Sequence, residues 1–350
     1  MEPINFSAYI EEGPHTFFDN ITTNMSVLEI DNLSFPLTNN DREFDNSYVC
    51  SPYGQYIEYG IQELSHLAPS WLKSPLVAVL KGVGKILKRG DINKVVMVNN
   101  WLFSTNLYPD ISREQILKLI STLQQQYPEH AIVFKSINQV TTPAFFDSLP
   151  FKLIPSRPIY LFNPNTPRAF KSRMVQSDRK ILKNTPYRRI ALTKENAPRI
   201  AELYRMLNIE KHAKINPQFN AKFIEMALRT SLLEFIAFEK DGEIDAVCGF
   251  FCQNNVMTSP LFGYDTTKPK DLGLYRLISI ALMLEAKERG FLLHMSAGAG
   301  SFKRLRRAKK HMEYNALFIN HLGKKRQRPW KAIDFVMNKI GVPVLNHFEL

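Results

Sequence analysis

The sequence predicts a mixed α/β fold, because strand-type and helix-type patterns alternate along most of the chain. The alternation is clearest between residues 187 and 320, where the expected order of elements is β-α-α-β-β-β-α-β-α-β. Two turn signals support this order: Asp241-Gly242 and Asn254-Asn255 each lie between two apolar runs and favour tight hairpins. A sheet with both hairpins and helical crossovers is therefore expected.

Five zones can be distinguished along the chain. Residues 1–46 are rich in Asn and Asp, and we expect an irregular acidic leader there. Residues 47–165 predict a first domain, and residues 166–184, which follow a stretch rich in Pro and Asn, are expected to be a linker. Residues 185–322 predict a second domain, and residues 323–350 a basic amphipathic segment.

In the first domain, apolar spacing predicts a helix over 61–67 and another after Ser112, whose hydroxyl is placed to cap it. Short apolar runs at 95–98 and 131–134 predict buried strands. In the second domain, strands are expected near 187–192, 234–239, 244–252, 256–264, 291–295 and 312–320. Helices are expected around 200–207, 223–228, 271–289 and 301–310.

The cysteines and the first residues indicate the compartment. Three cysteines (Cys50, Cys248 and Cys252) are too few for a disulfide framework and lack zinc-finger spacing, so no metal site is expected. The first twenty residues contain four acids and no Lys or Arg, unlike a signal peptide. No stretch has the length of a transmembrane helix. A reduced, cytoplasmic location is therefore expected.

The net charge of +12 is unevenly distributed. Residues 1–46 hold nine acids and one base, so the remaining chain holds 24 acids and 44 bases, a surplus of 20 positive charges. A body this basic favours partners that carry negative charge: nucleic acid, an anionic membrane, coenzyme A or an acidic carrier protein. Charge alone does not choose among them.

Two motifs resemble those of a known superfamily. The stretch His294-Met-Ser-Ala-Gly-Ala-Gly-Ser-Phe-Lys303-Arg-Leu-Arg306 resembles the strand ending in glycines, followed by an aromatic–lysine pair and a helix, of GNAT acyltransferases. The segment from Gly263 to Tyr275 looks like the turn into their central helix. Residues 258–322 are most similar to Fem-type and related acyltransferases, which carry two GNAT domains in tandem. The first domain resembles a second, degenerate copy.

The resemblance implies a donor site around that turn and the glycine-rich loop. The residues expected to contact the donor are Lys270, Leu272, Gly273, Leu274, Ser296, Gly298, Gly300 and Lys303. Helix N-termini carry free N–H groups and positive dipole, which suits a pyrophosphate. Tyr275 stands where the family has a second small residue. The competing interpretation is that the glycines serve only as a strand-to-helix turn.

The resemblance also places titratable groups near the reaction centre. Asp265, His294 and Tyr275 are the catalytic candidates, as base or as proton donor to the leaving group. His294 alternates with apolar neighbours, so a buried structural histidine is the competing interpretation. A water chain in place of a single base also remains open.

Polar residues close a predicted strand of the first domain. Asn99, Asn100, Trp101 and Ser104 could form an acceptor pocket between the two domains, or they could only cap the loop. Two further stretches, 71–89 and 330–340, have one apolar and one basic side. They favour either docking against the protein body or peripheral contact with an anionic membrane at its inner face.

Together these patterns predict an acyltransferase that moves an acyl group from a thioester to an amine or hydroxyl acceptor. Acyl-CoA or an acyl carrier protein would be the co-substrate, with no permanently bound cofactor. A Fem-type transferase that uses aminoacyl-tRNA is the alternative, although the helical hairpin common in that group is missing. A non-catalytic module that binds a membrane or nucleic acid is the third interpretation.

Overall fold

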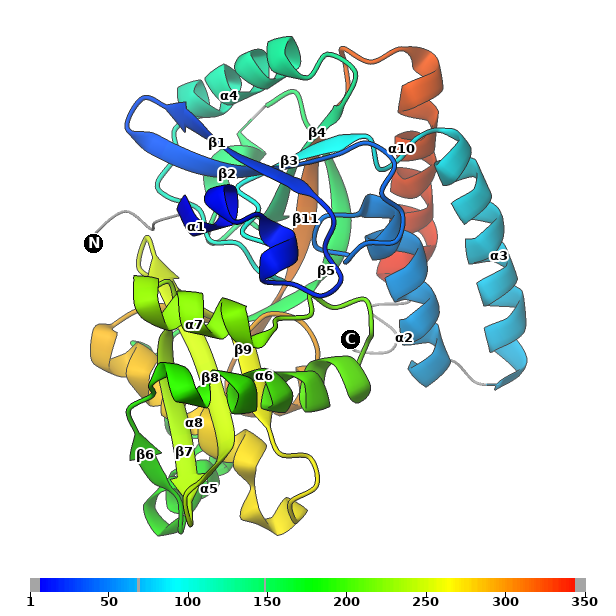
Figure 1. Cartoon of the computed structure of the whole chain (residues 1–350). Helices are drawn as coiled ribbons and strands as arrows, with labels where there is room; N and C mark the ends of the chain where they lie inside the picture. The colour runs from blue at the N-terminus through cyan, green and yellow to red at the C-terminus, as the bar shows by residue number, and fades with distance from the viewer. Residues whose placement is uncertain (1–6, 68–69, 148, 344–350) are drawn as a thin grey trace.

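The computed structural model describes residues 7–67, 70–147 and 149–343, and the strands in these ranges form one sheet of 11 (Figure 1). The order across the sheet is β1-β2-β3-β4-β11-β5-β10-β9-β8-β7-β6. The strands are β1 (Asn24–Ile30), β2 (Leu33–Asn40), β3 (Val95–Val98), β4 (Ala131–Ile137), β5 (Lys152–Phe162), β6 (Arg188–Ile190), β7 (Glu234–Lys240), β8 (Glu243–Gln253), β9 (Val256–Tyr264), β10 (Leu292–His294) and β11 (Lys309–Phe318).

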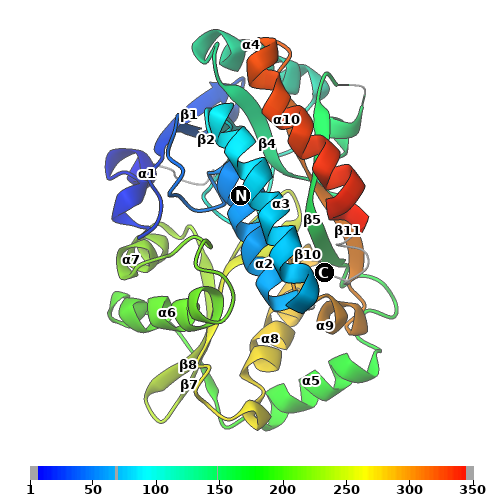
Figure 2. The ribbon, with the colours of Figure 1, turned by 90° about the vertical axis from the view of Figure 1, so that its right-hand side faces the viewer.

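Helices cover both faces of this sheet (Figures 1 and 2). In the C-terminal half, α6 and α7 pack on one face and α8 with α5 on the other; in the N-terminal half, α4 packs on one face and α2, α3 and α10 on the other. The helices are α1 (Ser7–Glu11), α2 (Tyr59–Leu67), α3 (Ser70–Arg89), α4 (Arg113–Gln126), α5 (Arg173–Asn184), α6 (Ala197–Tyr204), α7 (Ala221–Thr230), α8 (Leu274–Arg289), α9 (Gly300–Leu305) and α10 (Lys324–Val336).

The two halves of the sheet repeat one pattern and exchange a strand. Each half has an antiparallel meander that ends in a parallel pair, β3 with β4 and β9 with β10. The next strand comes from the other half: β11 pairs with β4, and β5 pairs with β10. Because β5 and β11 also pair with each other, an approximate twofold relation passes between them.

The predicted mixed α/β fold is confirmed, and so is the element order between 187 and 320. The leader was predicted wrongly. Residues 24–40 form the β1–β2 hairpin, which pairs with β3 and buries Phe35 and Leu37. Pro36 and the polar residues around it did not suggest a strand. Pro36 is tolerated because it precedes the part of β2 that pairs with β3, which begins at Leu37.

The linker prediction also needs correction. Residues 173–184 form α5, with the Ser172 hydroxyl accepting the Val175 N–H as an N-cap. The helix predicted to reach residue 310 ends at Leu305, and Lys309 and Lys310 belong to β11. The other predicted boundaries remain predictions. The basic C-terminal segment is helical over α10, and its part after residue 343 lies outside the described residues, as do residues 1–6 of the leader.

Candidate active site at the junction of the two half-sheets

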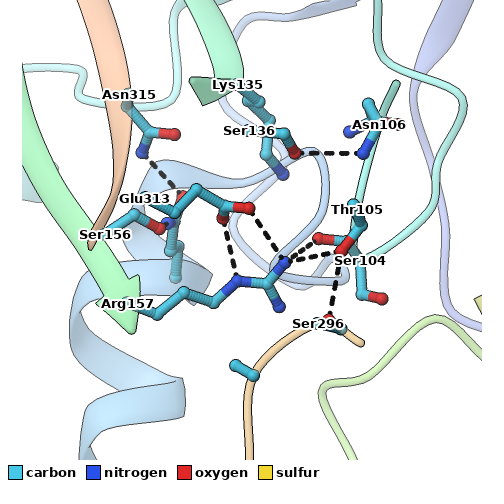
Figure 3. Close-up of polar contacts among 12 residues, drawn as sticks. Ser104, Thr105, Asn106, Lys135, Ser136, Ser156, Arg157, Ser296, Glu313 and Asn315 are labelled. Carbon is cyan, nitrogen blue, oxygen red and sulfur yellow. Dashed lines mark hydrogen bonds and ion pairs between the residues drawn. The ribbon is translucent and has the colours of Figure 1, made fainter. Parts of the chain in front are cut away.

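β4 and β10 are the second strands of the two parallel pairs. They end in a similar way, and one loop contacts both ends. Ser136 at the end of β4 and Ser296 just after β10 both adopt left-handed backbone, with φ of 60° and 57°. The Oγ of Ser136 accepts the Asn106 N–H at 3.0 Å, and Thr105 Oγ1 lies 3.1 Å from Ser296 Oγ (Figure 3). The loop that contains Thr105 and Asn106 therefore joins the two halves.

An ion pair crosses the same junction. Arg157 of β5 and Glu313 of β11 face each other in register, with Nε 2.8 Å from Oε1. The guanidinium also donates to Thr105 Oγ1 at 3.1 Å and to the Ser104 carbonyl (Figure 3). Burial by itself lowers the pKa of Arg157. Glu313 and other nearby groups outweigh burial, so the pKa of Arg157 is raised overall. Arg157 therefore keeps its charge, and through its bonds to Thr105 and Ser104 it fixes the loop against the centre of the sheet.

Lys135 is a second buried cation of this cluster. Its Nζ donates to the Val49 carbonyl at 2.5 Å and lies 5.7 Å from the Tyr48 ring centre. Burial lowers the pKa of Lys135 to about 7. Since the amine is partly neutral near physiological pH, it can accept a proton.

His294 presents an unused hydrogen-bonding group. It is 1% exposed, and its Nδ1 accepts the Ser296 N–H at 3.1 Å. Burial, with Arg157 and Lys303 nearby, lowers its pKa to about 3, so the ring is neutral. The hydrogen bond at Nδ1 assigns the ring proton to Nε2. That buried Nε2–H has no hydrogen-bond partner among the described residues.

The other two catalytic candidates lie elsewhere. Asp265 follows β9, whose residue Thr258 pairs with His294, so roughly 20 Å of extended chain separates them. Its carboxylate accepts from Arg199 at 2.7 Å and from Thr267, contacts that help to lower its pKa despite burial. Tyr275 packs among Phe262, Tyr264 and Phe302, and burial raises its pKa to about 12. Their catalytic roles remain predictions.

The predicted donor turn packs in part against α5. Gly273 has φ of 63°, and a Cβ there would lie 3.1 Å from Cδ1 of Ile181 on α5. Leu274 is buried in the core, while Lys270 is exposed and Leu272 half-buried. The N-terminus of α8 is thus packed against a helix that the sequence interpretation treated as linker.

The glycine-rich loop is accessible but its lysine is not. Gly298 is exposed, with φ of 74° and open space around it, whereas Gly300 is buried as the first residue of α9. The Nζ of Lys303 donates to the carbonyls of Met295 and Ala297 at 2.6 and 2.7 Å. Lys303 therefore shapes the loop, and its predicted contact with a donor remains a prediction.

Most of the residues predicted to bind the acyl acceptor form hydrogen bonds that hold the loop after β3 in place. Asn99 donates to the Leu107 carbonyl and accepts the Trp101 indole N–H, and Asn100 donates to Thr38 and to the Val49 carbonyl. These contacts match loop capping. Ser104, through its carbonyl on Arg157, is the member of the set that takes part in the junction.

Sequence reasoning missed Arg157, Glu313 and Lys135. A charged residue inside an otherwise apolar strand was the signal that could have revealed them. Lys135 is an example, because it lies in the run from Ala131 to Ile137, where every residue is buried. Such a charge needs a buried partner. The sequence does not reveal the partner, because Arg157 and Glu313 are 156 residues apart and come from strands exchanged between the halves.

A basic surface lies along α5. The segment before and within this helix contains six exposed bases: Arg168, Lys171, Arg173, Arg179, Lys180 and Lys183. The one acid between residues 163 and 184 is Asp178, which is buried and binds Arg276 of α8 and Arg306 after α9. α5 is thereby fixed next to α8 and α9, with its bases facing outward.

No protein-family model matches the chain, and no curated protein matches it. Solved structures resemble it in fold. FemX has a TM-score of 0.48 at 10% identity, covering 63% of this chain and 79% of that one. L-PGS from Bacillus licheniformis has a TM-score of 0.46 at 13% identity over 63% and 78%. The C-terminal domain (DUF2156) of a putative lysylphosphatidylglycerol synthetase from Agrobacterium fabrum has 0.45 at 12% over 64% and 77%.

At these identities the likeness concerns the fold alone. The strand order itself, with a parallel pair at the end of each meander, is that of two GNAT-like halves in tandem on one mixed α/β sheet. The class defined here is therefore a GNAT-like fold built of two halves, with its candidate site where the halves meet.

Proposed function

We propose that the protein is an acyltransferase whose reaction centre lies at the junction, beside His294. The observation that carries this proposal is the buried Nε2–H of His294, which has no acceptor in the described part of the chain. A buried donor without a partner is unfavourable in the free protein, and a substrate carbonyl would satisfy it. During acyl transfer that carbonyl oxygen becomes negative, so the same hydrogen bond strengthens in the transition state.

The cluster also contains a proton acceptor. In the proposed reaction the acceptor amine or hydroxyl attacks the carbonyl of a thioester, a C–N or C–O bond forms, and the C–S bond breaks. The proton of the acceptor must leave, and we assign it to Lys135, which precedes Ser136 of the junction and whose pKa burial lowers to about 7. The departing thiolate is finally protonated. Arg157 and Glu313 hold the Thr105 loop in place, which makes them positioning residues.

The donor that suits this protein best is an acyl carrier protein. The Ile181 side chain of α5 lies against Gly273, in the α8 turn that would hold the pyrophosphate of acyl-CoA, and leaves less room there for a ligand. The six exposed bases along α5 instead offer an outer surface for an acidic protein. Acyl-CoA, bound by the same bases, is the second thioester donor to be tested.

Aminoacyl-tRNA is a second candidate donor, because the same basic surface fits a phosphate backbone. It predicts tRNA binding that weakens steeply with salt.

The test is thermal denaturation with each donor. A ligand that binds only the folded protein raises its Tm. Acyl carrier protein is expected to stabilise the wild type and to stabilise Lys180→Glu/Lys183→Glu much less. The matched pair Lys222→Glu/Lys240→Glu, which lies on α7 and β7, should behave like the wild type. Stabilisation by tRNA alone, or by none of the donors, would contradict the thioester proposal.

A further inference from the structure

Helices α3 and α10 lie side by side on one face of the molecule (Figure 2). Their contact is close: a Cβ on Gly90, just after α3, would lie 2.4 Å from Cγ of Pro329 on α10. Arg326 of α10 also donates to the Gly90 and Lys94 carbonyls. The two amphipathic stretches recognised separately in the sequence thus form one surface, the α3–α10 face, together with the short helical segment η7 (Met337–Gly341) that follows α10.

This face concentrates the exposed apolar side chains of the protein. Seven large apolar residues in the described ranges are at least 43% exposed, and four of them lie on α3, α10 or η7: Val79, Ile86, Phe335 and Ile340. Phe335, at 62%, is the most exposed of the seven. Single exposed apolar residues are common, but a group on two adjacent helices indicates an interaction surface.

The same face is strongly basic. α3 carries four exposed bases and no acid, and α10 with η7 carries five exposed bases and one acid. That acid, Asp334, is neutralised by Lys152 at 2.7 Å. On α3, Val79, Ile86 and Arg89 follow at helical spacing, and on α10 so do Arg328, Lys331 and Phe335. Each helix therefore presents apolar and basic groups on the same side.

We infer that the α3–α10 face binds an anionic lipid surface, with both helices lying flat on it. Apolar side chains at the level of lipid headgroups, surrounded by Lys and Arg, are the features that hold a helix in that plane. No helix of the described residues is long and apolar enough to cross a membrane. This inference does not depend on the acyl-transfer reaction.

A nucleic acid is the less suitable occupant of this face. Phosphate groups would account for the bases, but they gain nothing from four exposed aliphatic or aromatic side chains. Stacking on bases would need several aromatic side chains, and the exposed set contains one, Phe335.

The test is sedimentation of the full chain with vesicles. We expect about tenfold or greater preference for phosphatidylcholine containing about 30% phosphatidylglycerol over pure phosphatidylcholine. Ile86→Ser/Phe335→Ser should lower binding to the anionic vesicles about tenfold without changing Tm, because both side chains are exposed. Leu305→Ser, a residue 57% exposed on α9, is the matched control and should bind like the wild type.

Charge is tested in the same assay. Arg89→Gln/Lys331→Gln should weaken binding by about fivefold for each charge at low salt, and so by about 25-fold in the double variant. Equal binding to neutral and anionic vesicles would overturn the inference. Unchanged binding of Ile86→Ser/Phe335→Ser to the anionic vesicles would also overturn it. A third contradicting result would be that the wild type and this variant both bind an RNA duplex in preference to the anionic vesicles.

Discussion

At the scale of single residues, burial controls charge at the junction. His294 and Lys135 are both buried, and for both the neutral form is favoured, whereas Arg157 keeps its charge because Glu313 faces it. His294 is neutral across the physiological range, so in the proposed reaction its role is that of a hydrogen-bond donor and not of a base. Lys135 is the group of this set that titrates near neutral pH.

Lys135 predicts a specific pH dependence of stability. Its folded pKa of about 7 lies below its ordinary value of 10.5, so between these values the unfolded chain binds the extra proton. The free energy of unfolding should therefore rise with pH over this window. Lys135→Met should reduce that slope, measured by urea unfolding between pH 7 and 9, by about 1 kcal/mol per pH unit. The exposed Lys180→Met serves as control, and an unchanged slope in Lys135→Met would show that Lys135 is charged in the fold.

At the scale of elements, the pairing of β5 with β11 depends on a buried ion pair. Glu313→Gln leaves the Arg157 charge without its partner and should destabilise the protein by about 3–5 kcal/mol. Arg157→Met/Glu313→Met should lose much less than the sum of the two single variants, as a double-mutant cycle would measure. Asp91→Asn, at the exposed Arg42–Asp91 pair, should change stability by less than about 1 kcal/mol. Additive losses at the junction would contradict the described pairing.

The approach of α6 to β9 gives a second prediction at this scale. A Cβ on Gly263 would lie 2.6 Å from the carbonyl carbon of Leu203, and backbone cannot move aside as a side chain can. Gly263→Ala should therefore destabilise the protein by about 1–3 kcal/mol in urea unfolding. Gly82→Ala is the same substitution inside α3 with nothing within 4 Å, and it should stabilise by up to about 1 kcal/mol. Equal effects would contradict the close packing.

Local sequence patterns predicted most elements, and the elements that they missed depend on contacts between distant segments of the chain. The meander from β7 to β9 and helix α8 follow from apolar periodicity and two turns, which are local properties. The β1–β2 hairpin and α5 were missed because they carry Pro, Asn and charged residues and are stabilised by tertiary contacts, with Asp178 of α5 bound to two arginines. Of the residues at the junction, His294, Ser296 and Ser104 were already candidates in the sequence, and their roles remain predictions, whereas Arg157 and Glu313 become partners only through the fold.

At the scale of the whole molecule, the exchanged strands make the two halves interdependent. β5 lies between β10 and β11, and β11 lies between β4 and β5, so each half lacks a central strand without the other. The predicted boundary near residue 165 therefore divides the sequence, but it does not divide the protein into two units that fold independently.

This interdependence predicts one cooperative unfolding transition for the full chain. Fragments 1–165 and 166–350 expressed alone should give no cooperative melting, because β5 in the first fragment has lost both neighbours. Circular dichroism of each fragment and of their mixture is the measurement. Two independent transitions in the full chain, or a stably folded single fragment, would contradict the strand exchange.

The most direct test of the central claim is amine-dependent release of thiol from an acyl carrier protein thioester, with acyl-CoA in parallel. We predict release by the wild type, a loss of about 100-fold or more in kcat for His294→Ala, and a smaller loss for His294→Gln, which keeps an N–H donor. Tm, measured alongside, separates this loss from unfolding. No amine-dependent release from either thioester, or equal rates for the wild type and a folded His294→Ala, would contradict acyl transfer at the junction.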